Sequence, residues 1–322
     1  MEPYRFSLTI DIRRLRVLRE LRERGSVGAT ASALNLTPSA ISQQLAALSR
    51  EVGAPLLTPH GRGVRLTPQA HLLLEHAAAI DTQLERARTD LAALDAGTVG
   101  RVNLGAFASA ITGIVAPALR RLRLERPRLV VAVHEVEAPE CFTRLDAGDL
   151  DLAMTVDYPG GPHRTDPRYS RQELLDDPML VALRPDHARA GQAAVALGDL
   201  ADQTWIVGAV RGPCQEVACA ACTGAGFSPD VRHFVDNWEA ALALVASGCG
   251  VALVPRLAVP AEGFAGIVLR PLSGAQGPSR HLYSAVRAGS ANHPSLAPVL
   301  AALAWASASP RQATKANILI SK

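Results

Sequence analysis

The amino-acid sequence predicts an α/β protein with an all-α winged helix-turn-helix domain at its N-terminus. Three observations in the 322 residues predict this arrangement. Residues 26–46 have the pattern of two short helices around a tight turn, and residues 68–95 carry apolar residues at alternating spacings of four and three. Residues 99–308 alternate short apolar runs with helical segments, which is typical of α/β sheets with parallel strands.

The first of the two short helices is predicted to follow Ser26 and to end before Asn35. Serine is a common N-cap because its side-chain oxygen accepts a hydrogen bond from a free backbone N–H group. Three residues are expected to form the apolar face of this helix: Ala29, Ala33 and Leu34.

The second short helix is predicted to follow Thr37 as its N-cap, with Pro38 at the first position, where a missing N–H group costs nothing. Apolar spacing at i, i+4 and i+7 predicts its buried face: Ile41, Leu45 and Leu48. The other face carries hydroxyl and amide side chains that can bond phosphates and base edges: Ser39, Ser42, Gln43 and Gln44. A DNA-reading helix is therefore expected, with a plain helical hairpin as the alternative.

The segment from residue 53 to residue 67 predicts a two-stranded wing, because paired glycines flank Arg62 between short apolar runs. Residues 1–67 contain ten arginines and five acidic residues, an excess suited to phosphate contacts, although an amphipathic solvated helix at 11–24 is the simpler explanation. The residues expected to bind DNA are Ser26, Val27, Thr37, Pro38, Ser39, Ser42, Gln43, Gln44, Arg62 and Arg65.

A long helix is predicted to start at Pro68 after the N-cap Thr67 and to end before Gly97. Its apolar residues form a heptad seam: Leu73, Ala77, Ile80, Leu84, Ala87, Leu91 and Leu94. Such a seam directly after a DNA-binding unit predicts a homodimer. The alternative is a helix that packs on its own domain.

The remainder, up to about residue 308, predicts strands near 101–105, 129–133, 152–155, 179–183, 205–207, 231–234, 251–254, 266–271 and 281–286. Helices are predicted near 111–125, 141–147, 213–225 and 238–247. Residues 309–322 are polar and weakly patterned, so we expect a disordered tail. No export signal and no membrane span is recognised, which predicts a cytoplasmic protein whose five cysteines form no structural disulfides.

Catalytic and metal-binding patterns are weak, and no cofactor or metal site is expected. Cys214, Cys219 and Cys222 invite a thiol-based redox interpretation, because Cys214 is close to a predicted helix N-terminus that can lower its pKa. No second cysteine pair or nearby histidine completes a zinc set. Buried packing is the alternative role for these thiols.

The order of these segments resembles that of a LysR-type transcriptional regulator over residues 10–307. The most specific matches are the runs 34–48, 51–56 and 61–68, with weaker ones at 100–105, 145–153 and 248–255. Leu57 stands where the family usually has phenylalanine, and Pro59 stands where it usually has arginine. The second departure removes an expected phosphate contact of the wing.

The resemblance implies a sequence-specific regulator that binds double-stranded DNA as a dimer or tetramer and is switched by a small-molecule effector. It implies a two-lobed module resembling periplasmic binding proteins. The domains would be 10–67 for DNA binding, 68–96 for dimerisation and 97–308 for the effector, with lobe one at 99–160 and 264–307, lobe two at 161–263, and the tail at 309–322. A solute-binding protein or an enzyme with an unrelated helical N-terminus is the alternative.

In such modules ligands bind at the carboxyl ends of strands, where helix N-termini present free N–H groups. Ser109 is the best candidate for a polar or acidic group of the effector, because a strand ends and a helix begins there. The residues implied to bind the effector are Phe107, Ala108, Ser109, Ala138, Pro139, Thr155, Asp157, Val207, Gly208, Ala209, Asp236, Asn237 and Pro255.

Overall fold

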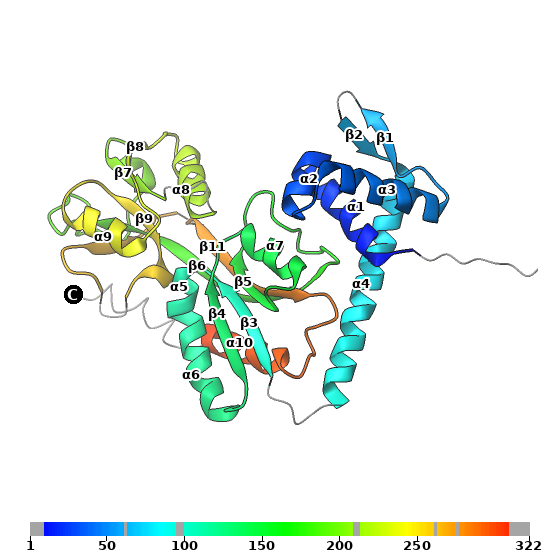
Figure 1. The fold of residues 1–322 in the computed structure, drawn as a ribbon. Coiled ribbons are helices and arrows are strands. Elements are labelled where there is room, and N and C mark those ends of the chain that lie inside the picture. Colours follow the sequence, from blue (N-terminus) through cyan, green and yellow to red (C-terminus); the bar gives the residue numbers. More distant parts are fainter. Residues whose placement is uncertain are drawn as a thin grey trace, which may run out of the picture. The chain divides into compact units, whose positions relative to one another are not determined.

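The computed structural model describes residues 10–60, 63–94, 100–208, 213–260, 263–274 and 277–308. The chain divides into two compact units, residues 1–86 and residues 87–322 (Figure 1). Arg62, Ala209 and the predicted disordered tail lie outside the described residues. Within the described residues, no helix combines the length and the hydropathy that crossing a membrane requires.

The first unit contains three helices, a two-stranded sheet and the beginning of a long helix. These elements are α1 (Ile12–Arg24), α2 (Val27–Ala33), α3 (Pro38–Val52), β1 (Leu57–His60), β2 (Gly63–Leu66) and α4 (Pro68–Leu94). Both predicted caps are confirmed, since Ser26 Oγ accepts from Ala29 N at 3.2 Å and Thr37 Oγ1 accepts from Ala40 N at 3.2 Å. The turn between α2 and α3 contains Asn35 with a φ of 53°, a conformation that asparagine tolerates better than most residues.

The core of the first unit confirms the predicted face of α3, because Ile41, Leu45 and Leu48 are buried. The predicted face of α2 was wrong in part: Leu34 packs against the core, but Ala29 and Ala33 are exposed. The buried residues of α2 are instead Thr30 and Ala31. Thr30 can be buried because its hydroxyl donates to the carbonyl of Ser26 at 2.8 Å.

The predicted wing is confirmed as an antiparallel pair of strands. Leu57 pairs with Leu66, and His60 pairs with Gly63. The wing leads directly into α4, whose N-cap Thr67 accepts a hydrogen bond from Ala70 N at 3.2 Å.

The apolar seam of α4 divides into two parts with different surroundings. Leu73 and Ala77 pack into the core of the first unit, so here the alternative of a helix packed on its own domain is correct. Ile80, Leu84 and Leu91 are 41%, 46% and 64% exposed. Only the later part of the seam therefore presents apolar side chains at the surface of this chain.

The second unit contains the strands β3 (Arg101–Ala106), β4 (Val130–Glu135), β5 (Leu152–Val156), β6 (Tyr169–Leu183), β7 (Thr204–Val207), β8 (Asp230–Phe234), β9 (Ala252–Pro255), β10 (Val268–Pro271) and β11 (Ser279–Arg287). Every predicted strand position is occupied by a strand. The expectation of parallel pairing is only half correct. β3 is parallel to β4 and β5, and β7 is parallel to β8, whereas β6 is antiparallel to β9, β10 and β11.

The helical segments of the second unit are α5 (Ala108–Ala110), the π-helical turn η1 (Ile111–Val115), α6 (Ala116–Glu125), α7 (Glu140–Ala147), η2 (Leu197–Leu200), α8 (Pro213–Gly224), α9 (Trp238–Ala246), η3 (Arg256–Ala258) and α10 (Leu296–Ala308). The sequence did not predict α10, because its apolar and alanine residues surround the helix without a polar stripe. It also missed the first ten residues of β6, which are mostly polar.

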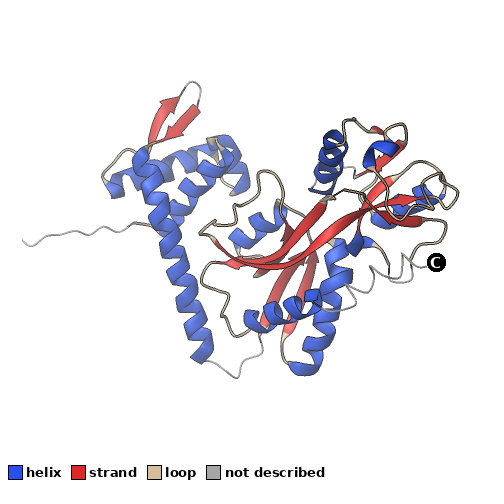
Figure 2. Cartoon of the chain, turned by 180° about the vertical axis from the view of Figure 1, so that it is seen from behind, coloured by secondary structure: helices blue, strands red, loops and turns tan. Residues whose placement is uncertain are grey.

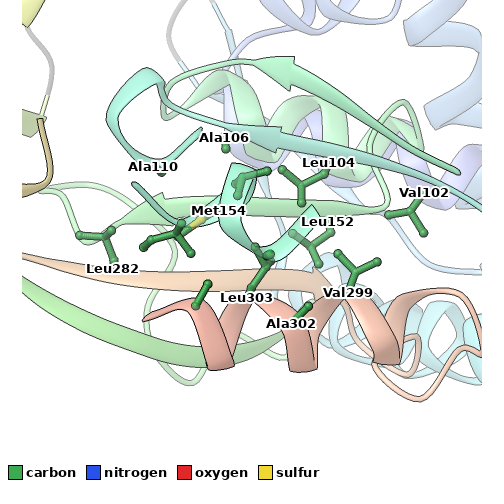
Figure 3. Packing of buried hydrophobic residues seen from close by; sticks show 14 of the residues in the cluster. Val102, Leu104, Ala106, Ala110, Leu152, Met154, Leu282, Val299, Ala302 and Leu303 are labelled. Atoms are coloured by element: carbon green, nitrogen blue, oxygen red, sulfur yellow. The ribbon is translucent and has the colours of Figure 1, made fainter. Parts of the chain in front are cut away.

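Lobe one has apolar cores on both faces of its sheet. On one face α6 and α10 cover β3, β5 and β11, as shown by Leu104, Leu152 and Leu303 in Figure 3. On the other face α7 contributes Cys141, Phe142 and Leu145 to a separate core. Lobe two has its own cores around Trp205 and Leu242.

The long strand β6 belongs to both lobes. Its residues up to Pro178 pair with β11, and its residues from Met179 pair with β9 and β10. Seven strands of the second unit accordingly form one long curved sheet, whereas β7 and β8 pair in a sheet of their own (Figure 2). On β6 the pairing partner therefore changes between Pro178 and Met179.

Replacing Leu104 with alanine should destabilise the second unit by about 2–5 kcal/mol, because a fully buried side chain leaves a cavity. The matched control is Leu124→Ala, since Leu124 is 79% exposed and its truncation should cost less than about 0.5 kcal/mol. Urea unfolding followed by tryptophan fluorescence measures this unit alone, because Trp205, Trp238 and Trp305 all lie in it. Equal midpoints for the two variants would contradict the prediction.

Candidate functional site

The polar face of α3 is exposed, opposite the buried face formed by Ile41, Leu45 and Leu48. The Ser42 hydroxyl donates to the carbonyl of Pro38 at 3.0 Å, and Ser39 shares a 3.0 Å hydrogen bond with Thr37. Gln44 is half-buried, whereas Gln43 is exposed. Among the hydroxyl and amide side chains predicted for this face, Gln43 is therefore the longest exposed one.

The other predicted DNA contacts differ in what they can offer. Ser26, Thr37 and Pro38 are exposed at helix N-termini, where backbone N–H groups suit a phosphate. Val27 packs on the core of the first unit, so its side chain is held inward. Arg65 is exposed on β2 and forms no ion pair within the described residues.

Part of the arginine excess is used inside the first unit. Arg19 pairs with Asp81 at 2.6 Å, and Arg24 pairs with Glu20 at 3.4 Å. Arg14 pairs with Glu51. The cations that remain exposed on or near α3 and the wing include Arg50 and Arg65.

In the second unit, Arg280 on β11 is the centre of a buried polar cluster. Its side chain is only 3% exposed. Nη2 donates to Asp177 Oδ2 at 2.5 Å and to Ser109 Oγ at 3.2 Å, and Nη1 donates to Cys214 Sγ at 3.4 Å. Cζ lies 5.0 Å from the centroid of the Phe107 ring.

Asp177 on β6 completes this cluster. Arg280 and Asp177 lie directly opposite each other on antiparallel strands, which is why their side chains meet. Asp177 is 2% exposed, and its second oxygen, Oδ1, accepts from Leu257 N at 2.9 Å. One ion pair thereby joins β6, β11, α5, α8 and η3.

Three buried side-chain atoms in the segments that form this ion pair and its contacts lack a hydrogen-bond partner among the described residues: Arg280 Nε, Arg256 Nη2 and Gln215 Oε1. Gln215 follows Cys214, and Arg256 precedes Leu257, so both belong to the segments that hold Arg280 and Asp177. Leaving a buried polar group unpaired costs about 1–3 kcal/mol. The cluster is therefore polar, buried and incompletely paired.

Burial and charge shift the pKa values of several groups in this cluster. Desolvation lowers the pKa of Arg256, and the nearby Asp177 opposes that effect. Desolvation raises the pKa of Glu137, which Arg280 opposes and the carboxylates of Glu135 and Asp236 reinforce. Glu137 follows β4 and Asp236 follows β8, so carboxylates from both lobes act at this place.

Of the predicted effector residues, Ser109 and Phe107 lie in the Arg280 cluster. Ala108 is exposed at the start of α5, beside them in the sequence. Asp236 is close enough to influence Glu137.

Several other predicted effector residues are held by contacts outside the Arg280 cluster. Thr155 points to the opposite face of the sheet, where its hydroxyl bonds Cys141. Asp157 is held by Arg171 at 2.6 Å and by Arg164 at 3.0 Å. Asn237 caps α9 through a 3.0 Å hydrogen bond from Ala240 N.

Within the described residues, the remaining predicted positions make no polar contact with the cluster. Ala138 packs against the core beside α7, next to exposed Pro139. Val207 and Pro255 are buried at the ends of β7 and β9, and Gly208 follows β7.

No sequence pattern indicated the residues of this part of the second unit: Arg280, Asp177, Arg256 and Gln215. Asp177 and Arg280 are 103 residues apart, so no local pattern joins them. The one available signal was an arginine directly before a predicted apolar strand, since Arg280 precedes the run His281–Val286. A charged side chain that becomes buried at the start of a strand needs a buried partner of opposite charge.

The thiols of Cys141, Cys214 and Cys222 are buried, and burial raises their pKa values instead of lowering them. Desolvation raises the pKa of Cys214, so the predicted lowering at a helix N-terminus was wrong; Arg280 opposes the rise without reversing it. Burial raises the pKa of Cys141 and of Cys222 to about 11. All five cysteines are free, and no group of three metal-binding side chains occurs within the described ranges.

A helix-turn-helix unit with a wing, followed by a long helix and a two-lobed α/β module, defines a DNA-binding transcriptional regulator with a ligand-binding module. Residues 12–71 match the bacterial regulatory helix-turn-helix protein, lysR family, and residues 95–307 match the LysR substrate binding domain. The chain belongs to the LysR family of transcriptional regulators. This assignment favours a regulator over a solute-binding protein or an enzyme with an unrelated N-terminus.

Individual relatives agree with this assignment. The chain is 30% identical over 280 residues to the HTH-type transcriptional regulator MetR of Salmonella typhimurium, which covers 87% of this chain and 85% of MetR. A mutant of OxyR from Corynebacterium glutamicum has the same fold, with a TM-score of 0.61, 22% identity, and coverage of 97% and 96% of the two chains. Full-length CbnR complexed with its target DNA gives a TM-score of 0.54, 21% identity, and coverage of 92% and 99%.

We expect Cys141, Cys214 and Cys222 to react slowly with a thiol reagent at neutral pH. A pKa raised from 9.0 to about 11 lowers the thiolate fraction of Cys141 and Cys222 about a hundredfold. The measurement is reagent uptake by a Cys219→Ser, Cys249→Ser double variant, native and unfolded, between pH 7 and pH 10. Rapid stoichiometric oxidation of the native variant by peroxide at pH 7 would support a redox role instead.

Proposed function

We propose that α3 lies in the major groove of DNA and that Gln43 reads a base there. The observation that carries this proposal is the exposed polar face of α3 opposite its buried apolar face. A glutamine amide offers a donor and an acceptor together, which suits bidentate contact with adenine. The CbnR structure with its target DNA supports the proposal, because this chain shares the CbnR fold.

Groups that bond phosphates without reading the base sequence would position the protein on the duplex. The exposed N-termini of α2 and α3, at Ser26 and Thr37, offer backbone N–H groups. Arg62 and Arg65 of the wing are the cations we assign to the DNA backbone. Such contacts make the affinity fall as salt concentration rises.

Replacing Gln43 with alanine should weaken binding to a specific site by about 1–3 kcal/mol and binding to unrelated DNA much less. The specific site is first selected from random DNA by the wild-type protein. Fluorescence anisotropy then compares both DNAs at one salt concentration.

The control for this experiment is Gln192→Ala, which removes a similar amide from the second unit. This control should bind both DNAs as the wild type does. An equal loss of affinity on both DNAs for the Gln43 variant would rule out base reading by this residue.

We further propose that residues 68–96 form the dimerisation helix between a DNA-binding domain at 10–67 and an effector module at 97–308. The exposed apolar side chains of Ile80, Leu84 and Leu91 support this proposal, because a second copy of α4 would cover them. The protein would act in the cytoplasm as a homodimer or homotetramer and catalyse no reaction, in line with the regulators it resembles.

Leu84→Asp should dissociate the dimer at micromolar concentration, because the carboxylate would be buried without a partner. Light scattering measures the mass of the assembly. Ala79→Asp is the matched control, since Ala79 is exposed on the same helix and lies outside the seam. If the Leu84 variant keeps the wild-type mass, this part of α4 is not the interface.

The effector is proposed to bind at the Arg280 cluster, where segments of both lobes meet. Ser109 supports this location, because it is buried, lies at the start of α5 and bonds Arg280. A ligand there would contact both lobes at once. It could shift the regulator between two forms by its difference in affinity for them.

A further inference from the structure

One line of residues on α3 lies directly opposite the buried face of the helix. Four residues at spacings of four, three and four form this line: Ser39, Gln43, Ala46 and Arg50. At about 3.6 residues per turn, they stay within about 60° of one another around the helix axis. All of them are exposed, whereas the opposite side of α3 fills the core of the first unit. When α3 enters a groove of DNA, this line faces the bases.

The two serines of the exposed face are already engaged by the protein itself. Ser42 donates its hydroxyl hydrogen to the carbonyl of Pro38 at 3.0 Å, and Ser39 shares a hydrogen bond of 3.0 Å with Thr37. A hydroxyl whose hydrogen is used offers only acceptor lone pairs to a base. Near the centre of the line, the groups left to distinguish bases are therefore the amide of one residue and the methyl group of another, which are Gln43 and Ala46.

Ala46 is the apolar position on this line, and its exposed side chain is a single methyl group. Among the four bases, only thymine presents a methyl group in the major groove. Ala46 follows Gln43 by three residues, which is about 4.5 Å along the helix axis. The rise per base pair of DNA is about 3.4 Å. Ala46 therefore faces a base pair one or two steps from the base pair that faces Gln43.

We propose that Ala46 is a second specificity-determining residue, whose methyl group contacts the C5 methyl group of a thymine within two base pairs of the adenine read by Gln43. This inference rests on the proposed function, namely that α3 lies in the major groove. The contact removes apolar surface of both methyl groups from water, which favours thymine over a base without the methyl group. Uracil has the same hydrogen-bonding edge as thymine, so hydrogen bonding alone cannot produce a preference between these two bases.

The test removes the methyl group of the DNA. In a site selected from random DNA by the wild-type, full-length protein, each thymine is replaced singly by deoxyuridine, and fluorescence anisotropy measures the affinity. We expect deoxyuridine to weaken binding by the wild type about threefold or more at one thymine at least. The proposal is overturned if no replacement of thymine by deoxyuridine weakens binding.

A variant removes the methyl group of the protein. Ala46→Gly should bind the thymine and deoxyuridine sites equally, because the methyl group of the DNA then has no partner. The matched control is Ala79→Gly, which removes the methyl group of an exposed alanine on α4 and should keep the wild-type ratio of affinities. A wild-type ratio in Ala46→Gly would mean that another residue contacts the thymine, and the proposal fails. Since each ratio compares two DNAs on one protein, a partial loss of folded protein does not change it.

A second base analogue separates the failure of this inference from the failure of the proposed function. 7-Deazaadenine lacks the N7 acceptor, so it should weaken binding by the wild type but not by Gln43→Ala at the adenine that Gln43 reads. If it acts in this way but no deoxyuridine matters, base reading by Gln43 stands and the inference about Ala46 is wrong. If it has no effect while the deoxyuridine ratio depends on Ala46, the contact of Ala46 stands and base reading by Gln43 is wrong. A thymine contact more than two base pairs from the adenine contradicts the assigned position.

Discussion

The larger unit depends on one interaction, the buried ion pair between Arg280 and Asp177. Removing two charges from water is costly, and the pair is favourable only when further hydrogen bonds satisfy both groups. Asp177 meets this condition through Leu257 N, and Arg280 meets it in part through Ser109 and Cys214. Removing either charge would leave the other buried and unpaired, at a cost of about 3–5 kcal/mol. The segments that hold these partners are therefore fixed relative to one another.

The location of this pair follows from the topology of the sheet. Asp177 lies on β6 immediately before the strand changes its partner from β11 to β9 and β10. Antiparallel pairing sets Arg280 opposite Asp177, so the charges sit where the two lobes meet. Parallel pairing alone would not have predicted the contact between Arg280 and Asp177. A parallel βα alternation accounts for β3, β4 and β5, but a strand that returns between the lobes must run antiparallel to β6.

Features that depend on neighbouring residues could be predicted from the sequence, whereas contacts between residues far apart in the chain could not. The caps at Ser26 and Thr37, the buried face of α3, the wing and the strand positions each depend on neighbouring residues, and all were predicted correctly. The face of α2 was misjudged in part because Thr30 is buried in place of Ala29 and Ala33, and Thr30 satisfies its own hydroxyl within the helix. Ser109 was singled out from its place at a strand end, and the structure shows it bonded to Arg280. Arg280 and Asp177 were missed because their partnership exists only in the folded sheet.

Incomplete pairing at the Arg280 cluster has a consequence for switching. A regulator responds to a ligand only if the ligand binds one of its forms more tightly than the other. The apolar core of lobe one also includes Leu257 of η3, next to the cluster, so the two lobes pack against each other at this place. Leaving Arg280 Nε unpaired costs free energy, and under the proposed function a ligand that accepted a hydrogen bond from it would remove this cost. Because the same guanidinium also bonds Ser109 and Cys214, such a ligand would favour the placement of the lobes in which these contacts form.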